Sequence, residues 1–413
     1  MVSTSKCGFY MNQKRRYCGM TTKTGSSYCL EHLEVNNGTQ DEKRRVPCPL
    51  DPNHTVWASN LGRHVKKCNK LKLLHVNDNE PFYVRDCNVL RGDELGCGES
   101  PHPNELVIQS IPALEQIYAE RFLDLPLQCK SNEYMESHRC AELVSNRKHA
   151  LQQSSLIQHM LDQRLLQDTR FIEFGCGRAE LSRYIHQVAL QQNAGAPPSF
   201  TLIDRASNRM KFDSKFKEDF EKLRGAPADA AITRRCKIDI KDLKLDPLLD
   251  ADRDEVAVSK HLCGVATDLT LRCIANSDRL NRQGGLKGVC IAMCCRHVCD
   301  PDQYVNRPFI ESLLRGKSDL SYRDFFNSLR KMCSWATSGR REGLNEHDIG
   351  GHFTNLPLGR REQLGLMARR IIDEGRRQWV CENLTNRDYA VELIKYTTPD
   401  VSLENVAMLV YTK

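Results

Sequence analysis

The chain has 413 residues, which is enough for two or three domains with at least one sizeable hydrophobic core. Charged residues make up 27% of the chain, and its mean hydropathy is −0.53. The longest apolar run, around Val289–Cys295, is too short to cross a bilayer, which excludes a helical membrane protein. The net charge of +7 is a weak bias toward polyanionic partners.

The N-terminal residues lack the apolar core of a signal peptide. We therefore expect an intracellular chain, nuclear or cytoplasmic, in a reducing setting. In such a setting the 19 cysteines are expected to be thiols or metal ligands rather than disulfides.

Residues 1–35 are polar and poor in large apolar side chains. Their cysteines and one histidine follow the pattern C-x10-C-x10-C-x2-H, formed by Cys7, Cys18, Cys29 and His32. A segment with so little core needs another source of folding free energy, and a structural zinc ion supplies on the order of 10 kcal/mol. Four such ligands close a tetrahedral shell, so we predict a structural Zn²⁺ site.

Residues 45–72 contain a second set with the pattern C-x5-H-x9-H-x3-C, formed by Cys48, His54, His64 and Cys68. The last two ligands are four residues apart, which places them on one face of a helix. The alternative is that these are unrelated loop residues. Two complete four-ligand sets side by side in a core-poor region favour a second structural Zn²⁺ site.

Both patterns resemble known zinc fingers. The second is similar to the CHHC fingers of minor-spliceosome proteins and of one eukaryotic family of tRNA methyltransferases. The first is similar to the CCCH finger that precedes it in that methyltransferase family. The resemblance implies an RNA partner but does not say whether a reaction is catalysed.

Residues 73–140 are predicted to be a linker followed by a helical segment. Asn, Asp, Gly and Pro recur at short intervals over Leu71–Asn104, which is typical of loops. From Glu105 the pattern indicates a helix that is interrupted or begins near Pro112.

Residues 141–413 are predicted to form one α/β domain. The first helix, Arg147–Leu166, has apolar residues at helical spacing and is expected to cover the edge of the sheet, with His149 and His159 as packing or surface residues. Short apolar runs then alternate with helical stretches, which indicates a parallel, doubly wound sheet. The predicted parallel strands are Arg170–Phe174, Phe200–Asp204, Arg235–Asp239, Glu255–Lys260 and Gly288–Met293.

The last two predicted strands, Tyr389–Tyr396 and Asn405–Tyr411, are joined without a crossover helix and should pair antiparallel. Five parallel strands followed by an antiparallel pair resemble the Rossmann-like methyltransferase fold. This domain is therefore expected to bind S-adenosylmethionine in the crevice beyond the carboxyl ends of its strands.

The stretch FIEFGCGRAELSRYI, residues 171–185, carries the first part of that site. Glu173 lies at the end of a strand, and Gly175 and Gly177 let the backbone turn tightly and approach a ligand. A dinucleotide site favours a third glycine where this chain has Glu180, whose carboxylate would face a pyrophosphate. S-adenosylmethionine carries a cation and no phosphate, so this acid is compatible with it.

Two further acids lie at the ends of the next strands. Asp204 is placed to accept hydrogen bonds from ribose hydroxyls, and Asp239 is placed to meet an adenine amino group. Together with Glu173, Gly175 and Gly177 they form a predicted S-adenosylmethionine site.

The fourth and fifth strands end in KHLCG, residues 260–264, and MCCRH, residues 293–297. These two motifs, together with ATDLTLRC at residues 266–273, resemble the tRNA methyltransferase family named above, and the domain order agrees. Members of this family methylate the ribose 2′-hydroxyl of nucleotide 4 in the tRNA acceptor stem. The resemblance implies a tRNA partner and requires neither a membrane nor an obligate protein partner.

For such a reaction the 2′-oxygen must lose its proton as it attacks the methyl group. Lys260 could remove the proton or stabilise the developing charge if its neighbours lower its pKa. His261 or His297 could act as the base instead, and Arg296 could hold the flanking phosphate. The Lys-Asp-Lys-Glu set of many ribose methyltransferases cannot be placed here, so the base is left open.

Four cysteines, Cys290, Cys294, Cys295 and Cys299, raise the question of a third metal. Strand alternation sends adjacent side chains to opposite faces, which favours ordinary buried thiols, and the question is left open.

Residues 298–388 form an insertion longer than a crossover needs, and we expect a subdomain over the cleft that docks RNA. The alternative is a capping helix with an ordinary basic face. Six short basic clusters along the whole chain favour a phosphate-contacting surface. They are Lys43-Arg44-Arg45, Lys66-Lys67, Arg340-Arg341, Arg360-Arg361, Arg369-Arg370 and Arg376-Arg377.

Two other functions stay open from the sequence. The chain could be a zinc-finger RNA-binding adaptor whose methyltransferase-like domain is not catalytic, or a methyltransferase that acts on a protein or a small molecule. A nicotinamide-dependent oxidoreductase is a more distant alternative.

Overall fold

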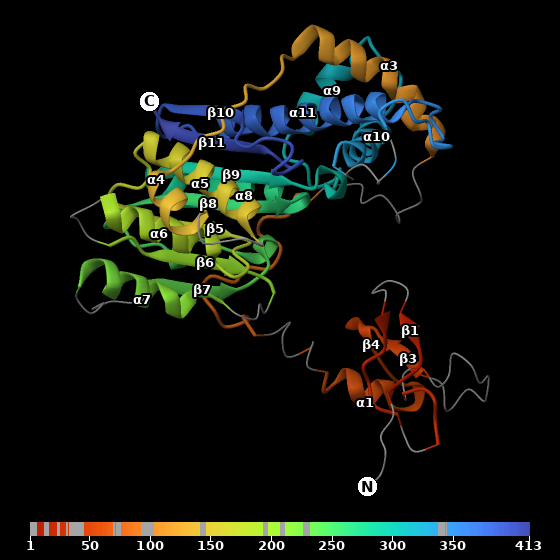
Figure 1. Ribbon diagram of the computed structural model, residues 1–413, viewed down its shortest axis with the longest axis horizontal. Coiled ribbons are helices and arrows are strands. Elements are labelled where there is room, and N and C mark those ends of the chain that lie inside the picture. Colours follow the sequence, from red (N-terminus) through yellow and green to blue (C-terminus); the bar gives the residue numbers. More distant parts are fainter. Residues whose placement is uncertain are drawn as a thin grey trace. The chain divides into compact units, whose positions relative to one another are not determined.

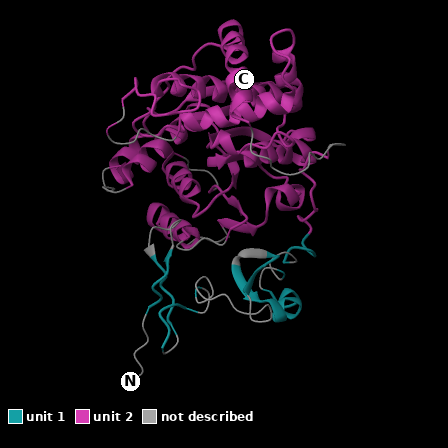
Figure 2. Cartoon of the chain, turned by 90° about the vertical axis from the view of Figure 1, so that its right-hand side faces the viewer, with its two compact units in different colours: residues 1–80 teal, residues 81–413 magenta. Residues whose placement is uncertain are grey.

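The computed structural model describes residues 6–11, 16–22, 25–29, 32, 45–68, 71, 76–91, 103–140, 146–192, 197–206, 211–225, 232–337, 343 and 345–413. The chain divides into two compact units, Met1–Glu80 and Pro81–Lys413 (Figure 2). Within the described ranges every helix is too short or too polar to span a bilayer.

The described residues of the first unit include short strands and the helix α1 (Leu61–Val65). Strands β1 (Tyr10–Met11) and β2 (Arg16–Tyr17) pair antiparallel, as do β3 (Arg45–Cys48) and β4 (Asp51–Trp57). The 3₁₀ turn η3 (Ala58–Asn60) and helix α1 (Leu61–Val65) follow β4. The apolar cluster around β1 and β2 consists of three cysteines with Phe9 and Tyr28 against them, which is the core-poor composition that the sequence predicts.

The second unit contains one seven-stranded sheet with the order β10-β11-β9-β8-β5-β6-β7 (Figure 1). Its strands are β5 (Thr169–Phe174), β6 (Phe200–Asp204), β7 (Thr233–Lys237), β8 (Asp254–Cys263), β9 (Leu286–Cys294), β10 (Tyr389–Lys395) and β11 (Val406–Thr412). The first five are parallel, and β11 runs antiparallel to both of its neighbours. This confirms the predicted methyltransferase-like fold, including its C-terminal antiparallel strands.

Both faces of the sheet are covered, which explains why its central strands read as almost continuous apolar runs. Side chains from the two faces enter separate apolar clusters, one containing Leu156 and Ile185 and the other containing Leu271 and Val289. The helices that alternate with the strands are α5 (Arg147–Asp162), α6 (Glu180–Gln192), α7 (Asp213–Arg224) and α8 (Val265–Asn276). Shorter turns of helix are α4 (Glu133–Met135), η4 (Glu136–Cys140), η5 (Ile240–Asp242), η6 (Asp246–Leu248), η7 (Asp278–Arg282) and η8 (Arg296–Val298).

The insertion forms a helical subdomain with its own apolar cluster. It contains α9 (Arg307–Leu314), α10 (Tyr322–Trp335) and α11 (Leu358–Asn383), and α3 (Asn104–Arg121) from the segment before the sheet packs against α10 and α11 (Figure 1). A Cβ at Gly365 of α11 would lie 2.7 Å from the carbonyl oxygen of Met332, so this glycine allows α11 to approach α10 closely.

Two expectations for the segment before the sheet need correction. Helix α3 runs unbroken through Pro112. Residues 81–91, predicted as linker, pack against the sheet domain. There the buried side chain of Asn88 donates hydrogen bonds of 2.7 and 2.8 Å to the carbonyls of Ile240 and Leu243.

Candidate active site and metal centres

The first predicted zinc set is assembled in the structure. The ligand atoms of Cys7, Cys18, Cys29 and His32 all lie within 4.8 Å of one another. His32 Nδ1 is 3.4 Å from the sulfur of Cys7 and 3.3 Å from that of Cys29, and the sulfurs of Cys18 and Cys29 are 4.0 Å apart. A zinc–sulfur bond of about 2.3 Å gives a tetrahedral edge of about 3.8 Å, so the four atoms fit one Zn²⁺ ion.

The second set is assembled in the same way. Cys48 and Cys68 place their sulfurs 3.9 Å apart, and Nε2 of His64 lies 3.3 Å from the Cys48 sulfur. Nε2 of His54 lies 3.0 Å from Nε2 of His64. The three Cys and one His of the first set, and the two Cys and two His of this set, are donor sets typical of closed structural zinc sites.

The glycine turn lies between β5 and α6, at the point where the strand order reverses, which is where doubly wound sheets bind ligands. Gly175 has φ +62° and Gly177 has φ +51°, a left-handed conformation that favours glycine. A Cβ at Gly177 would meet no atom within 4 Å, so open space lies in front of this residue. The turn therefore has the backbone and the free space that a ligand of this fold requires.

Asp204, at the end of β6, holds the glycine turn in place. One of its carboxylate oxygens accepts a 2.7 Å hydrogen bond from the backbone N–H of Gly177, and the other accepts one from Ala206. Asp239 follows β7 and caps η5 by accepting a hydrogen bond from the Lys241 backbone N–H at 3.2 Å. The structure thus places both predicted acids at the same edge of the sheet as the turn.

Glu173 lies beneath the turn rather than in the open space before it. Its side chain is buried and accepts hydrogen bonds from the hydroxyl and the backbone N–H of Ser182, at 2.5 and 3.3 Å. Burial raises the pKa of Glu173 to about 7, although the hydrogen bonds from Ser182 oppose the shift. Glu173 therefore positions α6 and the turn instead of reaching a ligand directly.

Lys260 lies near the carboxyl end of β8, the strand beside β5. Its Nζ is 3.0 Å from Nδ1 of His149 on α5, a residue for which the sequence indicated only a packing or surface role. Burial lowers the pKa of Lys260 to about 8, against the opposing effect of the Glu180 and Glu173 carboxylates. Burial and the nearby Lys260 charge also lower the pKa of His149, so its Nδ1 is available as an acceptor near neutral pH.

The two histidines that the sequence offered as alternative bases, His261 and His297, lie at the ends of β8 and β9. His261 adopts φ +62°, and its ring meets that of His149 edge-on at 6.0 Å. Burial first, and then the charge of Lys260, lower the pKa of His261 to about 4, well below the usual range of a base near neutral pH. Within the described part of the chain, His297 Nδ1 is a buried nitrogen without a hydrogen-bond partner.

The structure does not support the phosphate-holding role predicted for Arg296. Its side chain has no exposed surface, and its guanidinium pairs with the carboxylates of Asp373, at 2.7 Å, and Glu404, at 2.5 Å. Asp373 and Glu404 lie 77 and 108 residues further along the chain, so the sequence offers no local sign of this pairing. Arg296 ties the end of β9 to α11 and does not contact a substrate in this arrangement.

In the pairs Arg369-Arg370 and Arg376-Arg377 of α11, one arginine of each pair is withdrawn from the surface. Arg369 and Arg376 are buried, and Arg376 pairs with the buried Asp268 of α8 at 2.6 Å. Arg370 and Arg377 both pair with Glu374 of the same helix at 2.6 Å. Arg369 and Arg376 therefore pack the helical subdomain, whereas Arg370 and Arg377 stay partly exposed beside Glu374.

Of the remaining basic clusters, Lys66-Lys67 is exposed in the first unit. Arg360 pairs with Glu115 of α3, and Arg361 donates to the carbonyl of Asp348 at 3.4 Å. Arg340-Arg341 and the first two residues of Lys43-Arg44-Arg45 lie outside the described residues.

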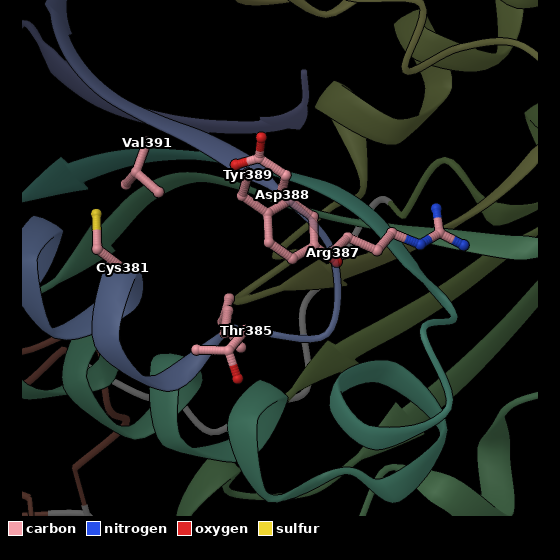
Figure 3. Close-up of a pocket in the computed structure, with 7 residues that line it drawn as sticks. Cys381, Thr385, Arg387, Asp388, Tyr389 and Val391 are labelled. Atoms are coloured by element: carbon pink, nitrogen blue, oxygen red, sulfur yellow. The ribbon is translucent and has the colours of Figure 1, made fainter.

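A pocket of about 390 Å³ lies at the end of α11 and the start of β10, and is lined by Cys381, Leu384, Thr385, Arg387, Asp388, Tyr389 and Val391 (Figure 3). Tyr389 donates a 2.6 Å hydrogen bond to the carbonyl of Leu286, the first residue of β9. The pocket is therefore at the amino ends of the parallel strands, opposite the edge that carries the glycine turn, and does not belong to the candidate site.

Comparison with known proteins gives matches along almost the whole chain. A family profile described as "Methyltransferase TRM13" matches residues 151–411. A "CCCH zinc finger in TRM13 protein" matches residues 5–33, and a "U11-48K-like CHHC zinc finger" matches residues 45–69. The residues matched by the two finger profiles contain the two assembled ligand sets.

One similar solved structure is that of the plantazolicin methyltransferase BpumL, bound to a pentazolic desmethylPZN analog and SAH. The match covers 75% of this chain and 98% of that one, with 12% identity and a TM-score of 0.26. A likeness at that score does not bear on function.

Full-length relatives are much closer. A protein named "tRNA:m(4)X modification enzyme TRM13" from Vanderwaltozyma polyspora is 46% identical over 99% of this chain and 98% of its own. The protein of the same name from Saccharomyces cerevisiae is 45% identical, over 99% of this chain and 96% of its own. The one from Schizosaccharomyces pombe is 33% identical, over 91% of this chain and 97% of its own. With the fold, both zinc-finger ligand sets and nearly full-length matches in agreement, the chain belongs to the TRM13 family of methyltransferases.

Proposed function

We propose that the protein transfers a methyl group from S-adenosylmethionine to the ribose 2′-hydroxyl of nucleotide 4 in the acceptor stem of tRNA. The zinc fingers, the glycine turn at the reversal of strand order and the names of the relatives support an RNA-directed methyltransferase. The single observation that carries the catalytic part is the contact between Lys260 and His149 near the end of β8, next to the strand that leads into the turn.

The residues of the turn fit the cofactor by their chemistry. When bound, S-adenosylmethionine supplies an electrophilic methyl group and a positive charge. Asp204 and Asp239 place carboxylates at the same edge of the sheet, where they can accept hydrogen bonds from ribose hydroxyls and an adenine amino group. Gly177 leaves the space that the ligand needs.

The remaining task of the protein is to take up the proton of the attacking hydroxyl. With a pKa of about 8, a substantial fraction of Lys260 is neutral near physiological pH, so its Nζ can accept that proton. The resulting ammonium donates a hydrogen bond to Nδ1 of His149, which holds it in place. In this scheme Lys260 is the base, His149 is a positioning residue, and His261 is too weak a base to compete.

The test is methyl transfer from radiolabelled S-adenosylmethionine to bulk tRNA by the full chain, followed by mapping of the modified nucleotide. We expect label on the 2′-oxygen of nucleotide 4. Lys260→Ala should lower turnover by about 10²- to 10⁴-fold while cofactor affinity changes little, because general-base catalysis contributes on that order.

Lys287→Ala is the matched control, since Lys287 also has a pKa lowered by burial but lies at the amino end of β9, where its Nζ donates to the carbonyl of Gln167. Turnover of this variant should stay close to that of the wild type. Methylation of a base, or of another nucleotide, would refute the proposed product. Near-normal turnover of Lys260→Ala would remove this residue from the mechanism.

A further inference from the structure

Three cysteine sulfurs meet at the carboxyl ends of β8 and β9. The Sγ atoms of Cys263, Cys294 and Cys295 all lie within 4.8 Å of one another, the same limit that holds for the two zinc-finger sets. The sulfurs of Cys294 and Cys295 are 3.2 Å apart. Among the described residues this is the third such gathering of metal-ligating side chains, and neither finger profile includes it.

Two departures from regular strand geometry bring the sulfurs together. The register of β8 against β9 shifts between Lys260 and Leu262, which places Cys263 directly opposite Cys294. Cys295 then leaves the strand with φ +50°, so its side chain does not alternate to the opposite face. The expectation from strand alternation is therefore wrong at this position.

Both departures carry a conformational cost. His261, inside the register shift, and Cys295 are non-glycine residues in the left-handed region, a conformation that is unfavourable for them and persists where the surroundings impose it. Glu404 helps to impose it, because its carboxylate accepts the backbone N–H of Cys295 at 2.8 Å and is itself held by the buried Arg296 and Arg369. Such strain is concentrated at functional sites in proteins.

We propose that Cys263, Cys294 and Cys295 bind a third Zn²⁺ ion through three thiolates and leave its fourth position open. Thiolate sulfur is a ligand that selects zinc among the common divalent ions, and three protein ligands with one open position distinguish a reactive zinc site from a closed structural one. Cys263 is exposed, whereas Cys294 is buried, so the ion is held from one side and accessible from the other.

Cys294 and Cys295 must move slightly apart to bind the ion. A tetrahedral zinc site has sulfur–sulfur edges of about 3.8 Å, so the sulfurs of Cys294 and Cys295 must separate by about half an ångström. Rotation of the half-buried Cys295 side chain can supply this separation. A disulfide between these neighbours fits less well, because adjacent Cα atoms are about 3.8 Å apart and disulfides usually need at least about 4.4 Å.

The test is the zinc content of the full chain, purified under reducing conditions without a chelator and measured by elemental analysis. We expect three zinc ions per chain for the wild type and two for Cys263→Ser, a change at an exposed side chain that should leave the fold intact. Cys381→Ser, at another exposed cysteine, is the matched control and should retain three. Cys48→Ala should lose one ion from the second finger, and adding Cys263→Ser to it should remove one more.

A second measurement begins with the wild-type chain, whose metal stoichiometry does not depend on a variant folding. Loading the wild-type chain with Co²⁺ should give a stoichiometry of three and thiolate-to-cobalt charge-transfer absorption from all three sites, one of which is missing in Cys263→Ser. Two zinc or cobalt ions in the wild type would overturn the proposal, as would an unchanged count in Cys263→Ser. Detection of a disulfide among these three cysteines in the freshly isolated chain would also overturn it.

Discussion

The buried Glu173 leads to a prediction about how stability depends on pH. Its pKa is raised to about 7 from an ordinary value of 4.5 because the carboxylate is buried. At a pH between these two pKa values, the Glu173 carboxyl has lost its proton in the unfolded chain but keeps it in the folded chain, so rising pH favours unfolding. The full cost is about 2.5 pKa units at 1.36 kcal/mol each, or roughly 3 kcal/mol, reached above pH 7.

Glu173→Gln removes this cost, because glutamine is neutral at every pH and its carbonyl oxygen can still accept the hydrogen bonds of Ser182. Chemical denaturation followed by circular dichroism at pH 5 and pH 8.5 gives the free energy of unfolding of both proteins. We expect the advantage of the variant to grow by about 2–3 kcal/mol between the two values. Glu255, which has a similarly raised pKa, contributes equally to both proteins and cancels.

Glu218→Gln, at an exposed glutamate of α7, is the control and should show no such growth. The reasoning would be refuted if the difference between Glu173→Gln and the wild type were the same at pH 5 and pH 8.5. That result would mean that Glu173 is ionised in the folded protein even at the lower pH.

Other predictions address the base, the turn, the fingers and the buried charges. Because Lys260 must be neutral to act, methyl transfer should rise with pH and level off above about pH 8, and a flat profile in steady-state assays would contradict this. Gly177→Val should weaken cofactor binding by tenfold or more in calorimetry, since a β-branched residue at φ +51° strains the turn by about 1–2 kcal/mol and fills its open space. Cys48→Ala should unfold the second finger and lower tRNA affinity in filter-binding assays, and unchanged affinity would argue against its role. Arg376→Met should destabilise the chain by about 3–5 kcal/mol in denaturant because it leaves a buried carboxylate unpaired, whereas the exposed Arg282→Met should change stability by less than about 1 kcal/mol.

Residue patterns were sufficient to predict most of the framework. Each predicted strand overlaps an observed one, because buried parallel strands are short apolar runs bounded by turns. Both zinc sets could be recognised from spacing alone, since a closed four-ligand site in a small polar segment restricts the possible arrangements. The glycine turn was recognised for a similar reason, because its positive φ angles favour residues without a Cβ.

Several of the contacts that the sequence did not reveal join residues that are distant along the chain. The pairing of Lys260 with His149 spans 111 residues, and that of Arg376 with Asp268 spans 108. A charge pattern does not reveal whether an arginine faces water or a buried carboxylate, so the buried positions of Arg369 and Arg376 in α11 could not be predicted from it. The direction of the Cys295 side chain depends on the left-handed backbone conformation of Cys295 itself, which strand periodicity does not predict.

The buried arginines have a mechanical consequence for α11. Arg296 and Arg376 connect this helix to the end of β9 and to α8, and sliding the helix by one turn would leave charges in an apolar interior without their counterions. Such displacement would be far more costly than shifting an interface of aliphatic side chains alone. The helical subdomain should therefore behave as a fixed wall of the catalytic domain, and any accommodation of a bulky acceptor must come from loops and side chains instead of from a swinging lid.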